Sequence, residues 1–160
     1  MAAPANPFAG DPDRAAIWEM LVARDIEAYA RQDWAMVADD FIEEGFFGFS
    51  GGRSADAGTW RMAYPDLAAY RTDWLAQAAE TAATAAMERL PAALHALSRL
   101  DKIDVDGGCA VARKCFDGAV PLADGSESEP LKWQTFYVCR RPAGRWRIQG
   151  FFGYLPHPLG

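Results

Sequence analysis

The sequence is poor in the residue types that bind metals or form disulfides. Its two histidines, His95 and His157, lie far apart and outside any Glu-x-x-His frame, so we expect no metal site and no cofactor. The three cysteines are odd in number and lack Cys-x-x-Cys spacing. Free thiols in a reducing compartment are the simplest interpretation, and a cytoplasmic location is therefore expected.

Basic runs and long apolar runs are also missing. With 16 basic and 22 acidic residues the net charge is −6, so neither nucleic acid nor an anionic membrane surface is an expected partner. The alanine-rich stretch around residues 75–90 is interrupted by Gln77, Glu80 and Glu88, too polar a composition for a bilayer. The first residues lack the charged start and apolar core of a secretory signal. The 160 residues, 51% of them hydrophobic, are enough for one domain with a sizeable core.

Helical signals dominate the first half of the chain. Residues 1–10, rich in Ala and Pro, predict a flexible arm before a single domain over residues 11–160. Asp11 can cap a helix with Pro12 at its first position, and this helix is predicted to run to about Arg31.

Two further helices follow in the prediction. Asp33 caps a shorter one that ends at Gly45 and buries an apolar face. A third begins at Asp66 and extends as far as Pro91, which marks its outer limit. The buried face of the second helix consists of Trp34, Val37 and Phe41.

Strand signals dominate the second half. The aromatic run "FFGFSGG" at 46–52 predicts one short strand between the helices. Residues 97–118 predict a hairpin around Asp106-Gly107-Gly108, and residues 131–156 predict two long strands joined at 142–144. Helices first and strands afterwards indicate an α+β fold with helices on one face of an antiparallel sheet.

One carboxylate is out of place in the first helix. At about 100° per residue, Asp25 projects between Leu21 and Trp18, near the middle of the apolar face. Full burial without a nearby cation would raise the pKa of Asp25, and such a carboxyl can act as a general acid or base, or donate a hydrogen bond while neutral. The alternative is a structural acid paired with Arg113, Lys114 or a tyrosine hydroxyl.

The order of these elements resembles the NTF2-like superfamily, and within it the SnoaL-like and ketosteroid-isomerase-like branch. The matching features are a long first helix ending in "RQDW", a short second helix, the aromatic strand, and the closing hairpin "VCRRPAGRWRIQGFFGYLP". The resemblance covers residues 12–156. It implies a cystatin-like cone, in which a strongly curved sheet wraps around the first helix and encloses a deep apolar pocket.

The resemblance also implies roles for particular residues. Asp25 falls where ketosteroid isomerases place a pocket-facing tyrosine, and His95 could complete an acid–base dyad with it, as in some SnoaL-like cyclases and dehydratases. Ser50 stands near the position of the isomerases' catalytic carboxylate; because a hydroxyl cannot abstract a proton from carbon without a base, it argues against their usual chemistry. The implied ligand-contacting residues are Trp18, Leu21, Tyr29, Ser50, Trp60, Trp133, Tyr137 and Phe152.

The alternation of side chains along a strand also predicts which residues form the wall of the pocket. It places Trp133, Thr135 and Tyr137 on one face of their strand, and Trp146, Ile148 and Phe152 on one face of the next. By analogy with the family, both faces point inward.

Three functions remain open from the sequence. The protein is an acid–base isomerase, dehydratase or cyclase acting on an apolar cyclic substrate, or a non-catalytic binder of a small apolar molecule, or a dimerisation or interaction protein. A homodimer through the outer face of the sheet is expected, because Phe136, Val138 and Phe151 would otherwise leave an apolar patch in solvent.

Overall fold

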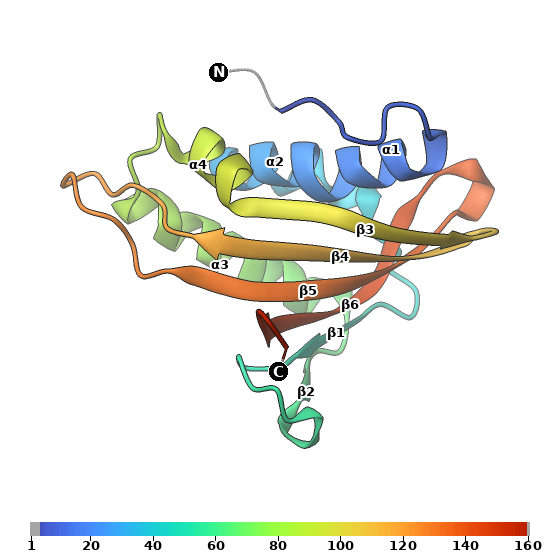
Figure 1. The fold of residues 1–160 in the computed structure, drawn as a ribbon. Helices are drawn as coiled ribbons and strands as arrows, with labels where there is room; N and C mark the ends of the chain where they lie inside the picture. Colours follow the sequence, from blue (N-terminus) through green and yellow to red (C-terminus); the bar gives the residue numbers. More distant parts are fainter. Residues whose placement is uncertain (1–3, 160) are drawn as a thin grey trace.

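The computed structural model describes residues 4–159, which form an α+β fold. A long N-terminal helix and a third helix pack against one face of a six-stranded, strongly curved sheet. In Figure 1, α3 (Leu67–Thr84) lies behind the sheet, and α1 (Pro12–Trp18), α2 (Asp25–Arg31) and α4 (Leu90–Leu97) lie along its upper edge. No helix among the described residues combines the length and apolar character needed to cross a membrane.

The first helix begins and ends as its sequence predicts, but its middle is wound differently. It consists of α1 (Pro12–Trp18), a π-helical segment (Glu19–Arg24) and α2 (Asp25–Arg31). The Asp11 side chain caps it by accepting a hydrogen bond from the backbone N–H of Arg14. The predicted flexible arm is packed where the structure describes it: Asn6 donates to the carbonyl of Ala15, 3.0 Å away, and Phe8 contacts the core.

The second predicted helix is replaced by two short 3₁₀ turns, Trp34–Met36 and Ala38–Asp40. Its apolar residues are nevertheless buried, as expected. The helix does not continue to Gly45, because the backbone N–H of Ile42 donates to the carbonyl of Ile148, 2.9 Å away, and the chain there joins the sheet edge.

The third helix is shorter than predicted. Helix α3 spans Leu67–Thr84, and a separate helix, α4 (Leu90–Leu97), follows it. The break comes at Ala85, where the chain becomes extended and pairs with Leu122 of a facing loop. Pro91 therefore lies in the first turn of α4, where its missing N–H is not needed, rather than limiting α3.

The sheet has the strand order β2-β1-β6-β5-β4-β3. The β1–β6 pair is parallel and the other pairs are antiparallel. The predicted hairpins are present, with a short 3₁₀ turn at Pro142–Gly144 between the last two strands, whereas β2 was not predicted. The strands are β1 (Phe47–Ser50), β2 (Arg61–Tyr64), β3 (Ser98–Asp106), β4 (Cys109–Gly118), β5 (Leu131–Arg140) and β6 (Arg147–Pro156).

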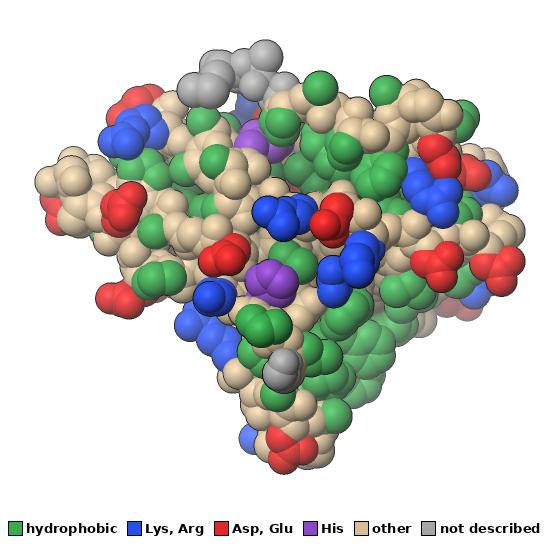
Figure 2. Space-filling view, viewed as in Figure 1, with side chains coloured by type: hydrophobic (Ala, Val, Ile, Leu, Met, Phe, Trp, Pro, Cys, Tyr) green, Lys and Arg blue, Asp and Glu red, His purple; other side chains and the backbone are tan. Residues whose placement is uncertain are grey.

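The outer face of the sheet carries an apolar patch, seen in Figure 2 as hydrophobic side chains gathered over β1 and β6. Phe152 stacks on Phe49, with 5.1 Å between ring centroids, and Phe49 is paired across the strands with the exposed Met62. Phe151, expected in this patch, is instead buried on the inner face. The outer patch consists of Phe47, Phe49, Met62, Val111, Phe136, Val138 and Phe152.

Candidate functional site

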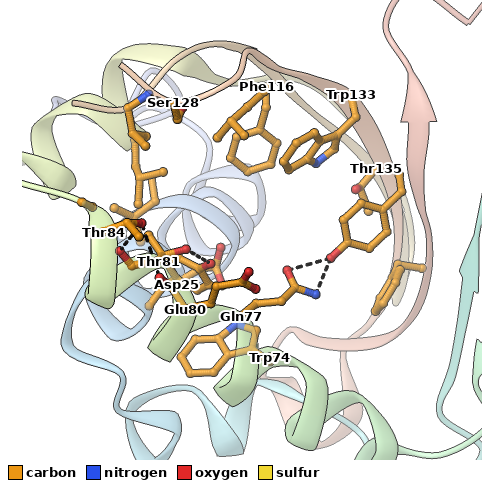
Figure 3. Close-up of a pocket in the computed structure, with 18 of the residues that line it drawn as sticks. Asp25, Trp74, Gln77, Glu80, Thr81, Thr84, Phe116, Ser128, Trp133 and Thr135 are labelled. Atoms are coloured by element: carbon orange, nitrogen blue, oxygen red, sulfur yellow. Dashed lines mark hydrogen bonds between the residues drawn. The ribbon is translucent and has the colours of Figure 1, made fainter. Parts of the chain in front are cut away.

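A cavity of about 350 Å³ lies between the helices and the inner face of the sheet. Figure 3 shows Phe116 and Trp133 on one side of it and Trp74 of α3 on the opposite side. The wall is mainly apolar, and eight of its residues are aromatic. The volume of the cavity lies at the lower end of the range typical of small-molecule sites, about 300–1,000 Å³. The aromatic lining residues are Tyr29, Tyr70, Trp74, Phe116, Trp133, Tyr137, Phe151 and Tyr154.

Asp25 faces this cavity and is paired with a buried lysine. Lys114 of β4 is fully buried, and its Nζ lies 2.7 Å from Oδ2 of Asp25. About a third of the Asp25 side chain, 32%, is exposed, against 1% for Lys114. The sequence left two alternatives for Asp25, a neutral buried acid and an acid in an ion pair. The structure shows the ion pair, because Lys114 supplies a cation beside the carboxylate.

The π-helical segment provides a second acceptor for Lys114. The backbone N–H of Asp25 donates to the carbonyl of Val22. An ordinary α-helix would direct that N–H to the carbonyl of Leu21. Here Leu21 accepts a hydrogen bond from Lys114 Nζ at 2.6 Å. The local unwinding of the helix and the position of the lysine thus belong to one arrangement, consistent with the frequent occurrence of such segments at functional sites.

Two tyrosine hydroxyls, those of Tyr70 and Tyr137, face the same region. Within residues 4–159, neither hydroxyl has a hydrogen-bond partner. Burial raises the pKa of both phenols well above its ordinary value, and the charge of Asp25 raises each further. Both hydroxyls therefore remain protonated at neutral pH and can donate to a group in the cavity.

The side chains of α3 form the wall of the cavity opposite the sheet, and hydrogen bonds hold several of them in place. Gln77 exchanges hydrogen bonds with the hydroxyl of Tyr154, at 2.9 and 3.0 Å, and also donates to Asp73. Thr81 bonds to the hydroxyl of Tyr29 at 2.8 Å. These contacts fix α3 to β6 and to the first helix across the cavity.

Four of the residues expected at the site line the cavity: Asp25, Tyr29, Trp133 and Tyr137. Thr135, placed on the same face by strand alternation, lines it as well.

Four other expected residues do not line it. Trp18 and Leu21 belong to the first helix, and both are buried in the hydrophobic core. Ser50 and Trp60 lie at the β1–β2 end, where Ser50 accepts from the N–H of Gly52 and Trp60 donates to the carbonyl of Ser54. Ser50 is thus outside the cavity, and the expectation that it supplies a polar group there is wrong.

Phe152 was also placed inside by alternation, and it lies on the outer face because β6 contains two irregularities. Val138 is opposite Gly150 and Cys139 is opposite Ile148, so one residue of β6 is left over. A second irregularity near Tyr154, whose φ is +53°, shifts the strand again. Each such bulge moves the following side chains to the other face. Phe151 and Tyr154 consequently line the cavity in place of Phe152.

His95 does not form the suggested dyad with Asp25. It lies on α4 and is not among the residues that line the cavity. Its Nδ1 is buried without a partner among the described residues. Burial lowers the pKa of His95, and the nearby charge of Lys114 lowers it further, so the ring is uncharged at neutral pH.

Residues of α3 are the main part of the wall that was not identified from the sequence. Tyr70, Trp74, Gln77 and Thr81 recur at intervals of four, three and four residues, which places them on one helical face. That spacing was available in the sequence, but nothing in it distinguishes a face lining a cavity from a face packed in a core.

Comparison with known proteins supports the fold and goes no further. No protein-family model and no curated protein matches the sequence. An NTF2-like protein of unknown function from Pseudomonas putida superimposes with a TM-score of 0.57 at 14% identity, over 93% of this chain and 88% of the other. An NTF2-like protein with a cystatin-like fold from Novosphingobium aromaticivorans gives a TM-score of 0.55 at 17% identity, over 91% and 82%. The chain has the NTF2-like fold.

A second structure from the same species is also similar to this chain. A candidate aromatic ring hydroxylase from Novosphingobium aromaticivorans superimposes with a TM-score of 0.52 at 16% identity, over 89% of this chain and 87% of the other. The resemblance of element order noted in the sequence is therefore confirmed at the level of the fold. The NTF2-like fold carries several kinds of function, so the activity has to be argued from the cavity itself.

Proposed function

We propose that this protein binds a small, mainly apolar, ring-shaped molecule in the cavity between α3 and the sheet. The observation that carries the proposal is a cavity of about 350 Å³ whose wall is mainly apolar, with eight aromatic residues, and whose polar side chains come from α2, α3, β5, β6 and the loop at Ser128. A cavity of this kind, with few polar groups among many apolar ones, is the usual form of a small-molecule site. Aromatic side chains on opposite walls suit a flat ligand.

Binding without catalysis is favoured over acid–base chemistry. Proton abstraction needs a base, most often a carboxylate or an imidazole, that is free to take up a proton in contact with the substrate. Asp25 is held by Lys114, His95 lies away from the cavity, and Ser50 is at the other end of the sheet. A second carboxylate, that of Glu80, does line the cavity, but Glu80 is an exposed residue of α3 and water competes for it. A role in orienting a ligand therefore fits these two carboxylates better than proton transfer.

Tryptophan fluorescence tests the proposal directly, because Trp74 and Trp133 line the cavity. The protein is titrated with steroids, flat polyketides, fatty acids and two-ring aromatic compounds. At least one ring compound is expected to change the emission with a dissociation constant below about 1 mM, corresponding to a binding free energy of about −4 kcal/mol. Failure of every compound in the panel to bind below millimolar concentration refutes the proposal.

A matched pair of variants locates the binding. Thr84 lines the cavity from the exposed end of α3, whereas its neighbour Ala83 is exposed and does not line it. Thr84→Trp should obstruct the cavity and weaken binding measured by calorimetry, and Ala83→Trp should leave it unchanged. Equal binding by both variants would place the ligand elsewhere.

A further inference from the structure

The charge of the cavity wall is of one sign. Among the described residues that line it, the only charged side chains are Asp25 of α2 and Glu80 of α3. Figure 3 shows these two residues close to Thr81, with both side chains directed into the cavity, and the hydroxyl of Thr81 is hydrogen-bonded to that of Tyr29. Burial raises the pKa of Tyr29, and the charges of both carboxylates contribute to that shift, which places both within electrostatic range of its hydroxyl.

The cations near the cavity cancel only part of this charge. Lys114 neutralises Asp25, and its ammonium already donates to Asp25 and to Leu21. The exposed Arg53 lies over the ring of Trp133, 5.3 Å from its centroid, but does not line the cavity. The carboxylate of Glu80 is therefore left without a cationic partner in the described structure.

Asp25 also has an unused acceptor. Lys114 occupies Oδ2, and no described residue donates to Oδ1. Within residues 4–159, the hydroxyls of Tyr70 and Tyr137 likewise have no hydrogen-bond partner. A carboxylate oxygen on a cavity wall is best satisfied by a donor, and the strongest donors are charged ones.

The aromatic wall favours the same kind of ligand. Trp74 and Tyr29 meet edge to face, with 5.6 Å between ring centroids, on one side of the cavity. Trp133 lies against Phe116 and Tyr154, at 5.4 and 5.7 Å, on the other. Ring faces attract cations, and the attraction is larger where water is excluded.

We propose that the ligand is a ring-bearing amine, bound as its cation with the ammonium group directed at Asp25 and Glu80. This inference rests on the proposed function, because it names the class of ligand for the same cavity. A ligand with one positive charge would make the site neutral: two carboxylates would then be balanced by Lys114 and the ligand. A carboxylate ligand would meet the uncompensated charge of Glu80 and no available cation, so the site disfavours fatty acids.

Four probes with one scaffold separate the contributions: 2-naphthylmethylamine, 2-naphthylmethanol, 2-methylnaphthalene and 2-naphthoate. Affinities are measured by tryptophan quenching at neutral pH. The amine should bind at least about tenfold more tightly than 2-methylnaphthalene, and 2-naphthoate should bind most weakly. Raising the salt concentration should weaken the binding of the amine and leave the affinity for 2-methylnaphthalene unchanged.

A matched pair of variants tests the role of Glu80. Glu80→Gln should weaken the amine by about threefold without changing the affinity for 2-methylnaphthalene, because only a charge is removed. Glu88→Gln removes the same charge from an exposed residue away from the cavity and should change neither affinity. An equal effect of both variants would overturn the inference.

The outcomes distinguish this inference from the function on which it rests. If 2-methylnaphthalene binds as tightly as the amine, the cavity binds apolar rings but does not select amines, and the inference alone is wrong. Tightest binding of 2-naphthoate or 2-naphthylmethanol likewise overturns it. If no probe binds below millimolar concentration, both the inference and the proposed function fail.

Discussion

Replacing Asp25 with leucine should strongly destabilise the protein, because it leaves a buried ammonium without its counter-ion. The Lys114 side chain is 1% exposed, and after the change its Nζ would keep only the Leu21 carbonyl as a hydrogen-bond acceptor, with the Phe116 ring centroid 5.0 Å away. Removing one partner of a buried ion pair typically costs about 3–5 kcal/mol. That is a large share of the total stability of a small domain, about 5–15 kcal/mol.

Urea denaturation followed by circular dichroism measures this change. With a denaturant dependence of about 2 kcal/mol per M, the midpoint of Asp25→Leu should fall by about 2 M. Lys114→Met should cost less, because Asp25, 32% exposed toward the cavity, can be hydrated there. The double variant should recover most of the loss, since an apolar pair of similar volume replaces the two charges. A midpoint for Asp25→Leu within error of the wild type would refute the ion pair.

Three further predictions follow from the outer patch, a close backbone approach and the tyrosines. We propose that the protein forms a homodimer through the outer patch. Sedimentation of the wild type should give twice the 17.5 kDa chain mass, and Phe152→Glu should give monomers. A monomeric wild type would contradict the proposal. A Cβ on Gly150 would lie 2.5 Å from the carbonyl oxygen of Phe47, so Gly150→Ala should lower the free energy of unfolding, measured by urea denaturation, by about 1–3 kcal/mol. Gly108 has open space around it, so Gly108→Ala should change the free energy of unfolding very little. Equal losses in the two variants would contradict this close approach. All five tyrosines have a raised pKa, mainly through burial. Tyrosines of the unfolded chain ionise near pH 10, about their ordinary pKa, so the stability that the protonated tyrosines contribute is present below that pH and is lost as the pH rises above it. The absorbance of tyrosinate should therefore appear together with the loss of ellipticity. Ionisation at ordinary pH with the fold intact would contradict the burial of these rings.

Local signals in the sequence were sufficient for most of the architecture. Capping residues such as Asp11 and Asp66 act on the N–H groups a few positions along the chain, so helix starts were predicted correctly. The end of the third helix was not: α3 ends at Thr84 because the backbone N–H of Ala86 donates to the carbonyl of Pro121, a contact between segments distant in sequence. No local pattern reports such a contact.

The candidate site shows the same division. Asp25 was identified from its position on the helical face, and Lys114 was among the partners considered for it, because both follow from periodicity and charge. Phe152 was misplaced because two bulges in β6 break the alternation on which the inference depended. Bulges respond to the curvature of the whole sheet, and a strand sequence read alone does not contain that curvature.

A crystal structure of the protein with 2-naphthylmethylamine tests the central claim most directly. The account predicts density for the rings between Trp74 and Trp133, with the amine nitrogen within hydrogen-bond distance of Asp25 or Glu80. Density for the probe only on the outer patch, with the cavity filled by rearranged side chains, would contradict it.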